Sequence, residues 1–115
     1  FPPTPFQLRT QVRVQKMLDY IARHYREPIT AADIAGAASI SRSEAGRCFK
    51  AYLGCSPVQA LLRHRLQVAR GLLQDRTLTV EEISAACGFS DASYFTRQFR
   101  KTYGMPPRQL RNLGK

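Results

Sequence analysis

The sequence predicts an all-α fold in which one helix-turn-helix pattern occurs twice, on either side of a long helix. Three observations support this prediction. Apolar residues recur with the period of an α-helix, capping residues stand where helices are expected to begin, and residues of the first half recur about 50 positions later. The expected order is therefore a first helix-turn-helix, a long helix and a second helix-turn-helix.

The second copy of the pattern begins at Thr79 and is the clearer of the two. Thr79 can cap a short helix, and Glu82, three residues later, can return the capping bond. Ile83 and Ala86 are expected to form the inward stripe of that helix. Gly88 stands where the helix ends, at a position that favours a positive φ.

The second helix of this copy has an apolar back and a basic front. Ser90 or Asp91 can cap it, and Phe95 and Phe99 lie one turn apart on the side that faces the core. Gly104 ends it, before a short helix from about Pro107 to Leu113. A DNA-recognition helix needs such a back and front. The front carries Ser93, Arg97, Arg100 and Lys101.

The same pattern occurs earlier in the chain. Thr30 caps a helix over about 30–38, and Ser41 with Glu44 forms a full capping box before a helix over 41–53. The turn between them lacks the glycine found at position 88. The expected inward stripe is Ala45, Cys48, Phe49 and Tyr52. Thr30, Ile34, Ala37 and Ser41 match Thr79, Ile83, Ala86 and Ser90 at an offset of 49, and Ser43, Arg47, Phe49, Gly54, Pro57 and Gln59 match Ser93, Arg97, Phe99, Gly104, Pro107 and Gln109 at an offset of 50.

The motifs of the second copy resemble the DNA-binding domain of the AraC/XylS family of bacterial transcription regulators. The resemblance covers roughly 12–113, and it is most specific in the Ala-Cys-Gly-Phe turn at 86–89 and in the stretch 94–101 that precedes Gly104 and the paired prolines. It implies two helix-turn-helix subdomains joined by a long linker helix, about seven helices in all. It also implies promoter DNA and RNA polymerase as partners, and a separate N-terminal effector or oligomerisation domain.

Charge favours a nucleic-acid partner. The 115 residues include 18 Lys and Arg against 8 Asp and Glu, giving a net charge of +10, and no acidic residue follows Asp91. A basic protein without a polyanionic partner is the alternative, but the duplicated basic face argues against it. No membrane-spanning apolar run or signal peptide is visible, so we expect a cytoplasmic location at the bacterial nucleoid.

The sequence shows no catalytic or metal-binding constellation. The acidic residues are scattered, neither histidine has a pattern typical of a catalytic triad, and there is no phosphate-binding glycine loop. Cys48, Cys55 and Cys87 lack CxxC spacing, and a packing role is favoured over redox sensing. We therefore expect no enzyme activity, no metal and no cofactor.

Four segments are expected along the chain. Residues 1–10 lack a helical period and are interpreted as the end of a linker from a missing N-terminal domain, and 11–55 form the first subdomain, beginning with an amphipathic helix that ends at 26–28. Residues 56–75 form the linker helix, with His64 exposed, and 76–115 the second subdomain. The expected buried face of the linker helix is Val58, Leu61, Leu62, Ala69, Leu72 and Leu73, with Leu66 near its flank.

Site residues are predicted from the two outward faces. A protein-interaction module, such as a polymerase-contacting surface, is the main alternative, but it would carry apolar anchors there. RNA binding would favour exposed aromatic platforms, and only Tyr94 fits that description. Base contacts are predicted for Arg42, Ser43, Arg47, Ser93, Tyr94 and Arg97. Phosphate contacts are predicted for Lys50, Thr96, Arg100, Lys101, Arg108 and Gln109.

Overall fold

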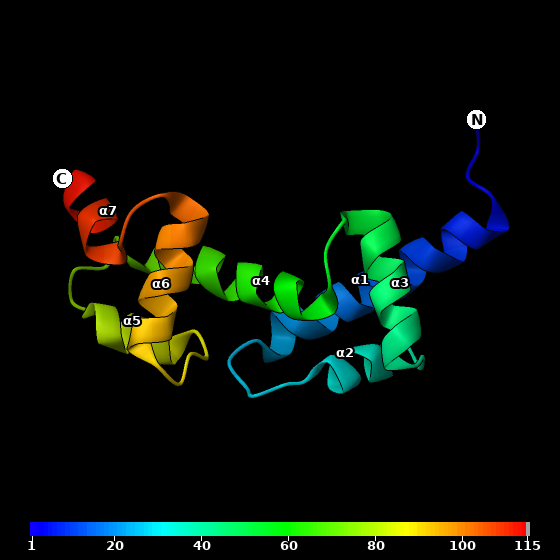
Figure 1. The fold of residues 1–115 in the computed structure, drawn as a ribbon, viewed down its shortest axis with the longest axis horizontal. Coiled ribbons are helices and arrows are strands. Elements are labelled where there is room, and N and C mark those ends of the chain that lie inside the picture. The colour runs from blue at the N-terminus through cyan, green and yellow to red at the C-terminus, as the bar shows by residue number, and fades with distance from the viewer. Residues whose placement is uncertain (115) are drawn as a thin grey trace. The chain divides into compact units, whose positions relative to one another are not determined.

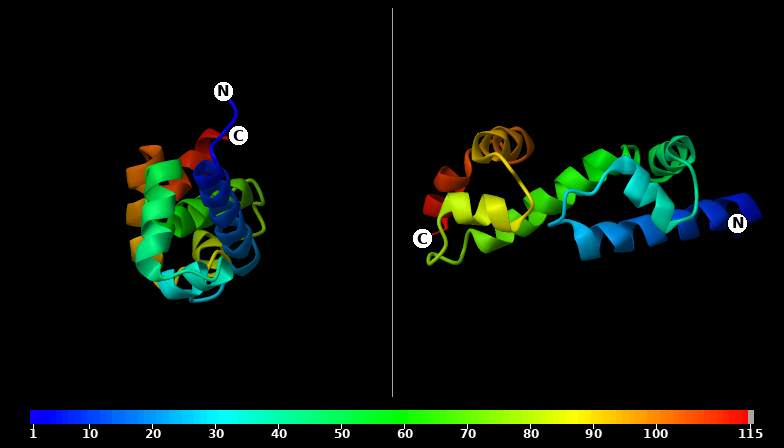
Figure 2. Two further views of the ribbon diagram at one scale, coloured as in Figure 1. Left: turned by 90° about the vertical axis from the view of Figure 1, so that its right-hand side faces the viewer. Right: turned by 90° about the horizontal axis from the view of Figure 1, so that it is seen from below.

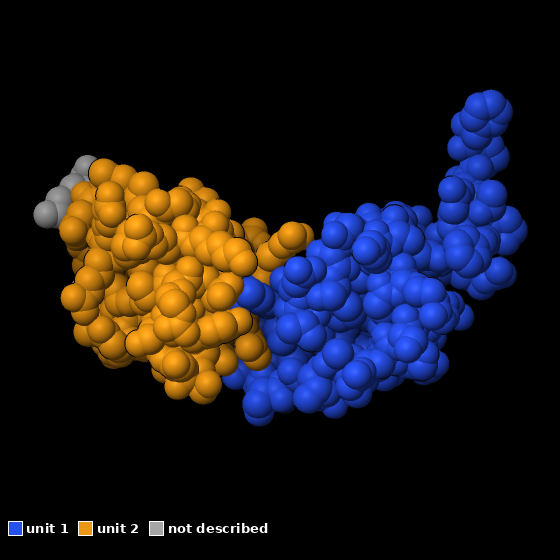
Figure 3. Space-filling view, in the orientation of Figure 1, with its two compact units in different colours: residues 1–62 blue, residues 63–115 orange. Residues whose placement is uncertain are grey.

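The computed structural model describes residues 1–114, which form seven α-helices and no β-strand (Figure 1). The predicted all-α fold is therefore confirmed. The chain divides into two compact units, residues 1–62 and 63–115, and the boundary falls inside α4 (Figure 3). The helices are α1 (Pro5–His24), α2 (Ala31–Ala37), α3 (Arg42–Leu53), α4 (Pro57–Leu72), α5 (Val80–Ala86), α6 (Ala92–Tyr103) and α7 (Pro107–Leu113).

The core of the first unit lies among α1, α2 and α3. Met17 and Ile21 of α1 pack with Ile34 of α2 and Phe49 of α3, and all four are at most 1% exposed. Figure 2 shows α3 nearly end-on where α1 runs lengthwise, so the two helices cross steeply. Leu61 from the start of α4 completes this cluster. The predicted inward position of Tyr52 is wrong, because its side chain is 48% exposed.

The first helix begins earlier than predicted. Thr4 forms a reciprocal capping box with Gln7, and Pro5 occupies the first helical position, where its missing N–H costs nothing. The expectation that residues 1–10 lack helical structure is therefore wrong from Pro5 onward. Phe6 and Leu8 in this first part of α1 are exposed, so no apolar stripe marked it as helical. The linker role of the segment stays a prediction.

The turns of the two helix-turn-helix units have the same backbone geometry despite their different residues. Ser39 adopts a positive φ of 57°, and Gly88 adopts 92° at the equivalent position. Each turn is closed by a corresponding bond: Ile40 donates to the Ala35 carbonyl at 3.2 Å, and Phe89 to the Ser84 carbonyl at 3.1 Å. A serine therefore accepts a left-handed conformation that usually favours glycine.

Aromatic residues organise the core of the second unit. The ring of Phe95 lies 4.9 Å from Phe89 and 5.7 Å from Phe99, and Phe99 lies 4.7 Å from Tyr103, measured between centroids. These separations suit tilted and edge-on aromatic packing. Phe95 and Phe99 are fully buried, as predicted, and they fix the back of α6. Cys87 is also buried, and Cys48, Cys55 and Cys87 form no disulfide within the described residues.

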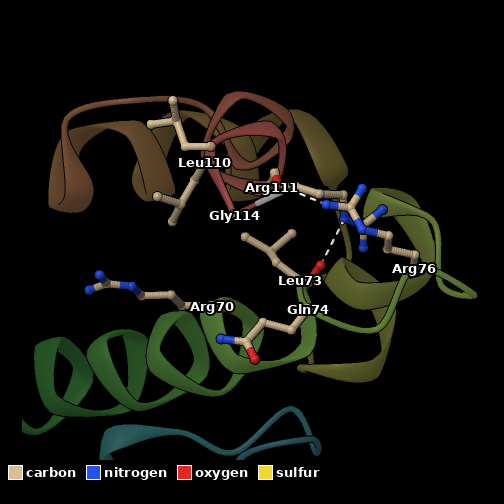
Figure 4. Close-up of a pocket in the computed structure, with 8 residues that line it drawn as sticks. Arg70, Leu73, Gln74, Arg76, Leu110, Arg111 and Gly114 are labelled. Carbon is tan, nitrogen blue, oxygen red and sulfur yellow. Dashed lines mark hydrogen bonds between the residues drawn. The ribbon is translucent and has the colours of Figure 1, made fainter.

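Arg111 holds α7 to the end of α4. Its Nε donates to the Leu73 carbonyl at 2.9 Å (Figure 4). Its Nη2 donates to the Asp75 carbonyl at 3.3 Å. Arg76 donates in turn to the Arg111 carbonyl at 3.4 Å. These bonds link the end of α4 and the loop after it to α7. Leu73 and Leu110 line a pocket beside these bonds.

The buried face of α4 differs from the prediction. Val58, predicted to be inside, is 53% exposed, whereas Leu66, predicted on the flank, is fully buried. The reason is that α4 contributes to two cores: Leu61 belongs to the first unit, while Leu66 and Ala69 are buried in the stretch assigned to the second. A single helical wheel over the whole helix averages these two faces.

Two smaller expectations about burial are also wrong. Ala86 was predicted to face inward, but it is exposed, and the buried residues of α5 are Val80, Ile83 and Ser84. His64 was predicted to be exposed, but it is half-buried, and desolvation lowers its pKa below the ordinary value.

Candidate nucleic-acid interface

Helices α3 and α6 are the second helices of the two helix-turn-helix units, and their ends are defined by the same local chemistry. Asp91 caps α6, accepting from the N–H groups of Ser93 at 2.8 Å and Tyr94 at 3.4 Å, which settles the choice between Ser90 and Asp91. Gly54 and Gly104 end α3 and α6 with φ values of 70° and 83°. Both helices therefore have defined lengths of 12 residues.

The outer face of α6 is polar and basic. Ser93, Tyr94 and Arg97 are exposed, and the Arg97 guanidinium carbon lies 6.0 Å from the centroid of the Tyr94 ring. The Tyr94 ring lies in turn 6.3 Å from buried Phe89. The core thus supports Tyr94, and Tyr94 supports Arg97 through a cation–π contact. The base-contact candidates of this unit therefore share one face.

The outer face of α3 carries the matching set. Arg42, Ser43 and Arg47 are exposed, and Ala45, Cys48 and Phe49 are buried on the opposite side. Arg47 Nη2 donates to Glu44 Oε2 at 2.5 Å. Its side chain is nevertheless 70% exposed, so the ion pair leaves most of the guanidinium open to a ligand.

The prediction of a full capping box at Ser41 is half wrong. Ser41 Oγ accepts from the Glu44 N–H at 3.2 Å, as expected. The Glu44 carboxylate does not return a bond to Ser41, because it accepts instead from Arg47 and from Arg13 of α1 at 3.4 Å. The hydrogen bond from Arg47, with the attraction of Arg47 and then Arg13, lowers the pKa of Glu44 although desolvation opposes it.

Comparison with known proteins places these two units in a family. Residues 34–113 match the family model described as a helix-turn-helix domain. The chain is 38% identical over 101 residues to the uncharacterised HTH-type transcriptional regulator YdeC of Bacillus subtilis, covering 88% of this chain and 35% of that protein. It is 34% identical over 99 residues to the HTH-type transcriptional activator RhaS of Pectobacterium carotovorum subsp. carotovorum, covering 86% of this chain and 36% of that protein.

Solved structures share the fold. A regulator from Chromobacterium violaceum, described as having an AraC-type DNA-binding domain, superposes with a TM-score of 0.84 at 33% identity, covering 89% of this chain and 91% of that one. The chain belongs to the AraC family of transcription regulators. The DNA-binding domain of AdpA, whose structure contains a target DNA, gives a TM-score of 0.81 at 26% identity, covering 88% of this chain and 91% of that one.

Membership of the AraC family makes this chain a sequence-specific DNA-binding domain of a transcription regulator. The predicted family and fold are confirmed. The chain spans about a third of the length of the curated relatives it matches. Within the described residues, no helix has both the length and the apolar composition needed to cross a bilayer.

The phosphate-contact candidates of this AraC-type domain differ in their exposure and in whether another residue already binds them. Lys50, Arg100 and Lys101 are exposed in the last turns of α3 and α6. Thr96 is half-buried, and Gln109 is exposed on α7. The remaining candidate, on α7, is engaged by an acid: Arg108 Nη2 donates to Glu81 Oε1 at 3.0 Å, with both side chains largely exposed.

Two residues that shape the interface were not predicted to do so. Arg13 and Glu44 form an ion chain with Arg47, yet Glu44 was predicted only as a cap and Arg13 was not predicted at all. The spacing of Glu44 and Arg47 by three residues was a usable signal, since such pairs meet on a helix surface. Arg13 lies 31 residues away in sequence, and no local pattern could indicate that contact.

Proposed function

We propose that α3 and α6 each enter the major groove of duplex promoter DNA and read two successive segments of one site. The observation that carries this proposal is the repeated arrangement of the two helices. In each, a buried face that includes phenylalanine fixes the back, with Phe49 in α3 and Phe95 and Phe99 in α6. An exposed arginine stands at the same register on the front, Arg47 in α3 and Arg97 in α6. Arginine is suited to bidentate contact with guanine O6 and N7.

The other base-contact candidates surround these arginines. Ser43 and Ser93 occupy equivalent positions near the starts of α3 and α6, and Arg42 and Tyr94 are exposed beside them. Hydroxyl groups can donate to or accept from base edges, and recognition helices use their N-terminal residues for such contacts. We assign base reading to this part of each helix.

Phosphate contacts fall to the residues that flank these positions. Lys50, Arg100 and Lys101 lie toward the C-terminal ends of the recognition helices, where a groove-bound helix approaches the backbone. Thr96, Arg108 and Gln109 supplement them in the second unit. The guanidinium of Arg108 is already paired with Glu81, so we expect Arg108 to contribute the least to DNA affinity among these residues.

RNA polymerase and an N-terminal effector or oligomerisation domain are the proposed protein partners of the whole regulator. The length of the curated relatives supports a further domain, and RhaS is named as an activator. A cytoplasmic location at the nucleoid follows from this role. Enzyme activity has no place in it, since the relatives are named as transcriptional regulators.

A protein-interaction role is the second candidate, and one observation favours it. Large apolar side chains are exposed on the first unit, namely Phe6, Leu8 and Val12 on α1 and Tyr52 and Leu53 at the end of α3. These residues do not lie among the base-contact candidates. An interaction surface would therefore accompany DNA binding in the first unit and would not replace it.

Selection of bound sequences from a random duplex library tests the proposed function. We expect one enriched site with two conserved segments about one helical turn, ~34 Å, apart, and no palindrome, because α3 and α6 differ in sequence. The Arg47→Ala variant should lose base preference in one segment, and Arg97→Ala should lose it in the other. A library without enrichment over unselected DNA would refute sequence-specific reading.

A further inference from the structure

The two recognition helices support their central arginines by different chemistry. Arg47 and Arg97 occupy equivalent positions, and the residue three places earlier supports each one. In α6 this residue is Tyr94, whose ring lies 6.0 Å from the Arg97 guanidinium carbon. In α3 it is Glu44, whose carboxylate accepts from Arg47 at 2.5 Å. A charge-assisted hydrogen bond is shorter, stronger and more directional than a distant cation–π contact.

Glu44 stands at a helix position that normally serves another purpose. The third helical residue can return a hydrogen bond to the N–H of the capping residue. In α3 this bond is absent, because both Glu44 oxygens accept from arginines, Arg47 on one side and Arg13 on the other. Four other helices make the returned bond, through Gln7 in α1, Asp33 in α2, Gln59 in α4 and Glu82 in α5.

The three side chains of the ion chain differ in their exposure to solvent. Arg13 and Glu44 are 37% and 34% exposed, whereas the Arg47 side chain is 70% exposed. Arg13 on α1 donates to one oxygen of the Glu44 carboxylate, and one Nη of Arg47 donates to the other oxygen. The remaining N–H donors of Arg47 stay available, since a guanidinium has five.

We propose that Glu44 is a positioning residue that determines the specificity of the first unit, holding Arg47 toward base edges and away from phosphates. This inference rests on the proposed function, in which Arg47 contacts a base. A carboxylate beside the guanidinium repels phosphates, so Arg47 gains less from contacts that carry no sequence information. It also restricts the rotamers of Arg47 before DNA arrives, which lowers the entropy lost on binding.

The inference predicts that specificity and general affinity change in opposite directions in Glu44→Gln, which keeps the size of the side chain and removes its charge. Discrimination at the base pair contacted by Arg47 should fall by about fivefold or more, the lower range of one good bidentate contact. Affinity for unrelated duplexes should rise, and the salt slope should steepen by up to about one unit as Arg47 reaches a phosphate.

The experiment measures binding of each variant to the selected duplex, to its single-base variants and to an unrelated duplex over a range of salt concentrations. Asp19→Asn is the matched control for charge, because Asp19 is an exposed acid of the same unit that bonds to Gln15 on α1. It should leave base discrimination unchanged. In an Arg47→Ala background, Glu44→Gln should cause no further loss of discrimination.

The outcomes separate this inference from the proposed function. Base preferences that survive Arg47→Ala would refute base reading by Arg47 itself. Preferences that Arg47→Ala removes but Glu44→Gln retains would overturn only the role of Glu44. Equal weakening on all duplexes by Glu44→Gln would also overturn it, since a purely structural residue acts in that way. Arg13→Gln leaves the Glu44–Arg47 pair in place and should cause a smaller loss of base discrimination than Glu44→Gln. This second variant keeps the test decisive if Glu44→Gln folds poorly.

Discussion

Replacing Arg97 by alanine tests base reading in the second unit with little disturbance of the fold. Arg97 is exposed on α6 and its contact in the described structure is the 6.0 Å approach to Tyr94, so its loss removes no buried group. Exposed substitutions of this kind usually change the free energy of unfolding by less than about 0.5 kcal/mol. Alanine also favours the helix. Any large change in DNA affinity therefore arises at the interface.

The expected loss follows from the contact that arginine can make. One bidentate pair with guanine contributes about 1–3 kcal/mol of discrimination, which corresponds to roughly 5- to 150-fold in affinity. The loss should appear only on duplexes that carry the preferred base pair. Arg47→Ala should differ in one respect, because it removes one of the two arginine partners of the Glu44 carboxylate, and the less neutralised carboxylate then repels the DNA.

The assay is a titration of labelled duplexes, followed by fluorescence anisotropy, with all four base pairs tested at each position of the selected site. Arg23→Ala is the matched control, since Arg23 is exposed on α1 and carries the same charge. Arg97→Ala should abolish preference at one position only. Equal losses on every duplex, with a smaller salt slope, would instead show a phosphate contact and refute base reading by Arg97.

Three further predictions concern phosphates, stability and pH. Arg100→Ala or Lys101→Ala should weaken binding alike on all duplexes and reduce the salt slope by about one unit, measured by salt titration; an unchanged slope would contradict this. Ser84→Ala should raise the free energy of unfolding in urea by about 1 kcal/mol, because the buried Ser84 hydroxyl has no hydrogen-bond partner among the described residues. The free energy of unfolding of the original protein should fall between pH 7.5 and pH 5.5, and it should fall less in the His64→Gln variant.

The sign of the pH prediction follows from the direction of the shift. Desolvation lowers the pKa of folded His64 below its ordinary value of 6.5, so the unfolded chain binds a proton more readily. The contribution of His64 to stability is therefore present above pH 6.5 and is lost as the pH falls through the folded pKa. Thermal unfolding at several pH values measures it, and identical profiles for the two proteins would contradict the prediction.

Features that depend on neighbouring residues were predictable from the sequence. The helix caps at Thr30 and Thr79, the helix ends at Gly54 and Gly104 and the positive φ of Gly88 depend on local residues, and the structure confirms them. The repeat also placed Arg47 and Arg97 on equivalent exposed faces. Caps and helix faces are set by spacings of three or four residues, which a sequence displays directly.

Features that depend on distant residues were not predictable. Ser39 takes a positive φ because the surrounding turn imposes it, and its own residue type disfavours that conformation. Leu66 is buried because α4 serves a second core, which no wheel over one helix can indicate. The start of α1 carries a capping signal at Thr4 and Gln7. The apolar residues that follow are exposed and do not form a buried helical stripe, so the pattern of apolar residues did not indicate a helix there.

The repeat itself explains how one backbone can provide two different readers. The turns of both units close with equivalent hydrogen bonds, and both recognition helices end at a left-handed glycine. The backbone that orients each recognition helix is therefore the same in both units. The two units differ in side chains that lie outside the buried core, such as Glu44 in α3 and Tyr94 in α6. Because these two positions support the central arginines and do not build the core, they can differ without loss of fold. We therefore expect an asymmetric DNA site, because the side chains of the two recognition helices differ.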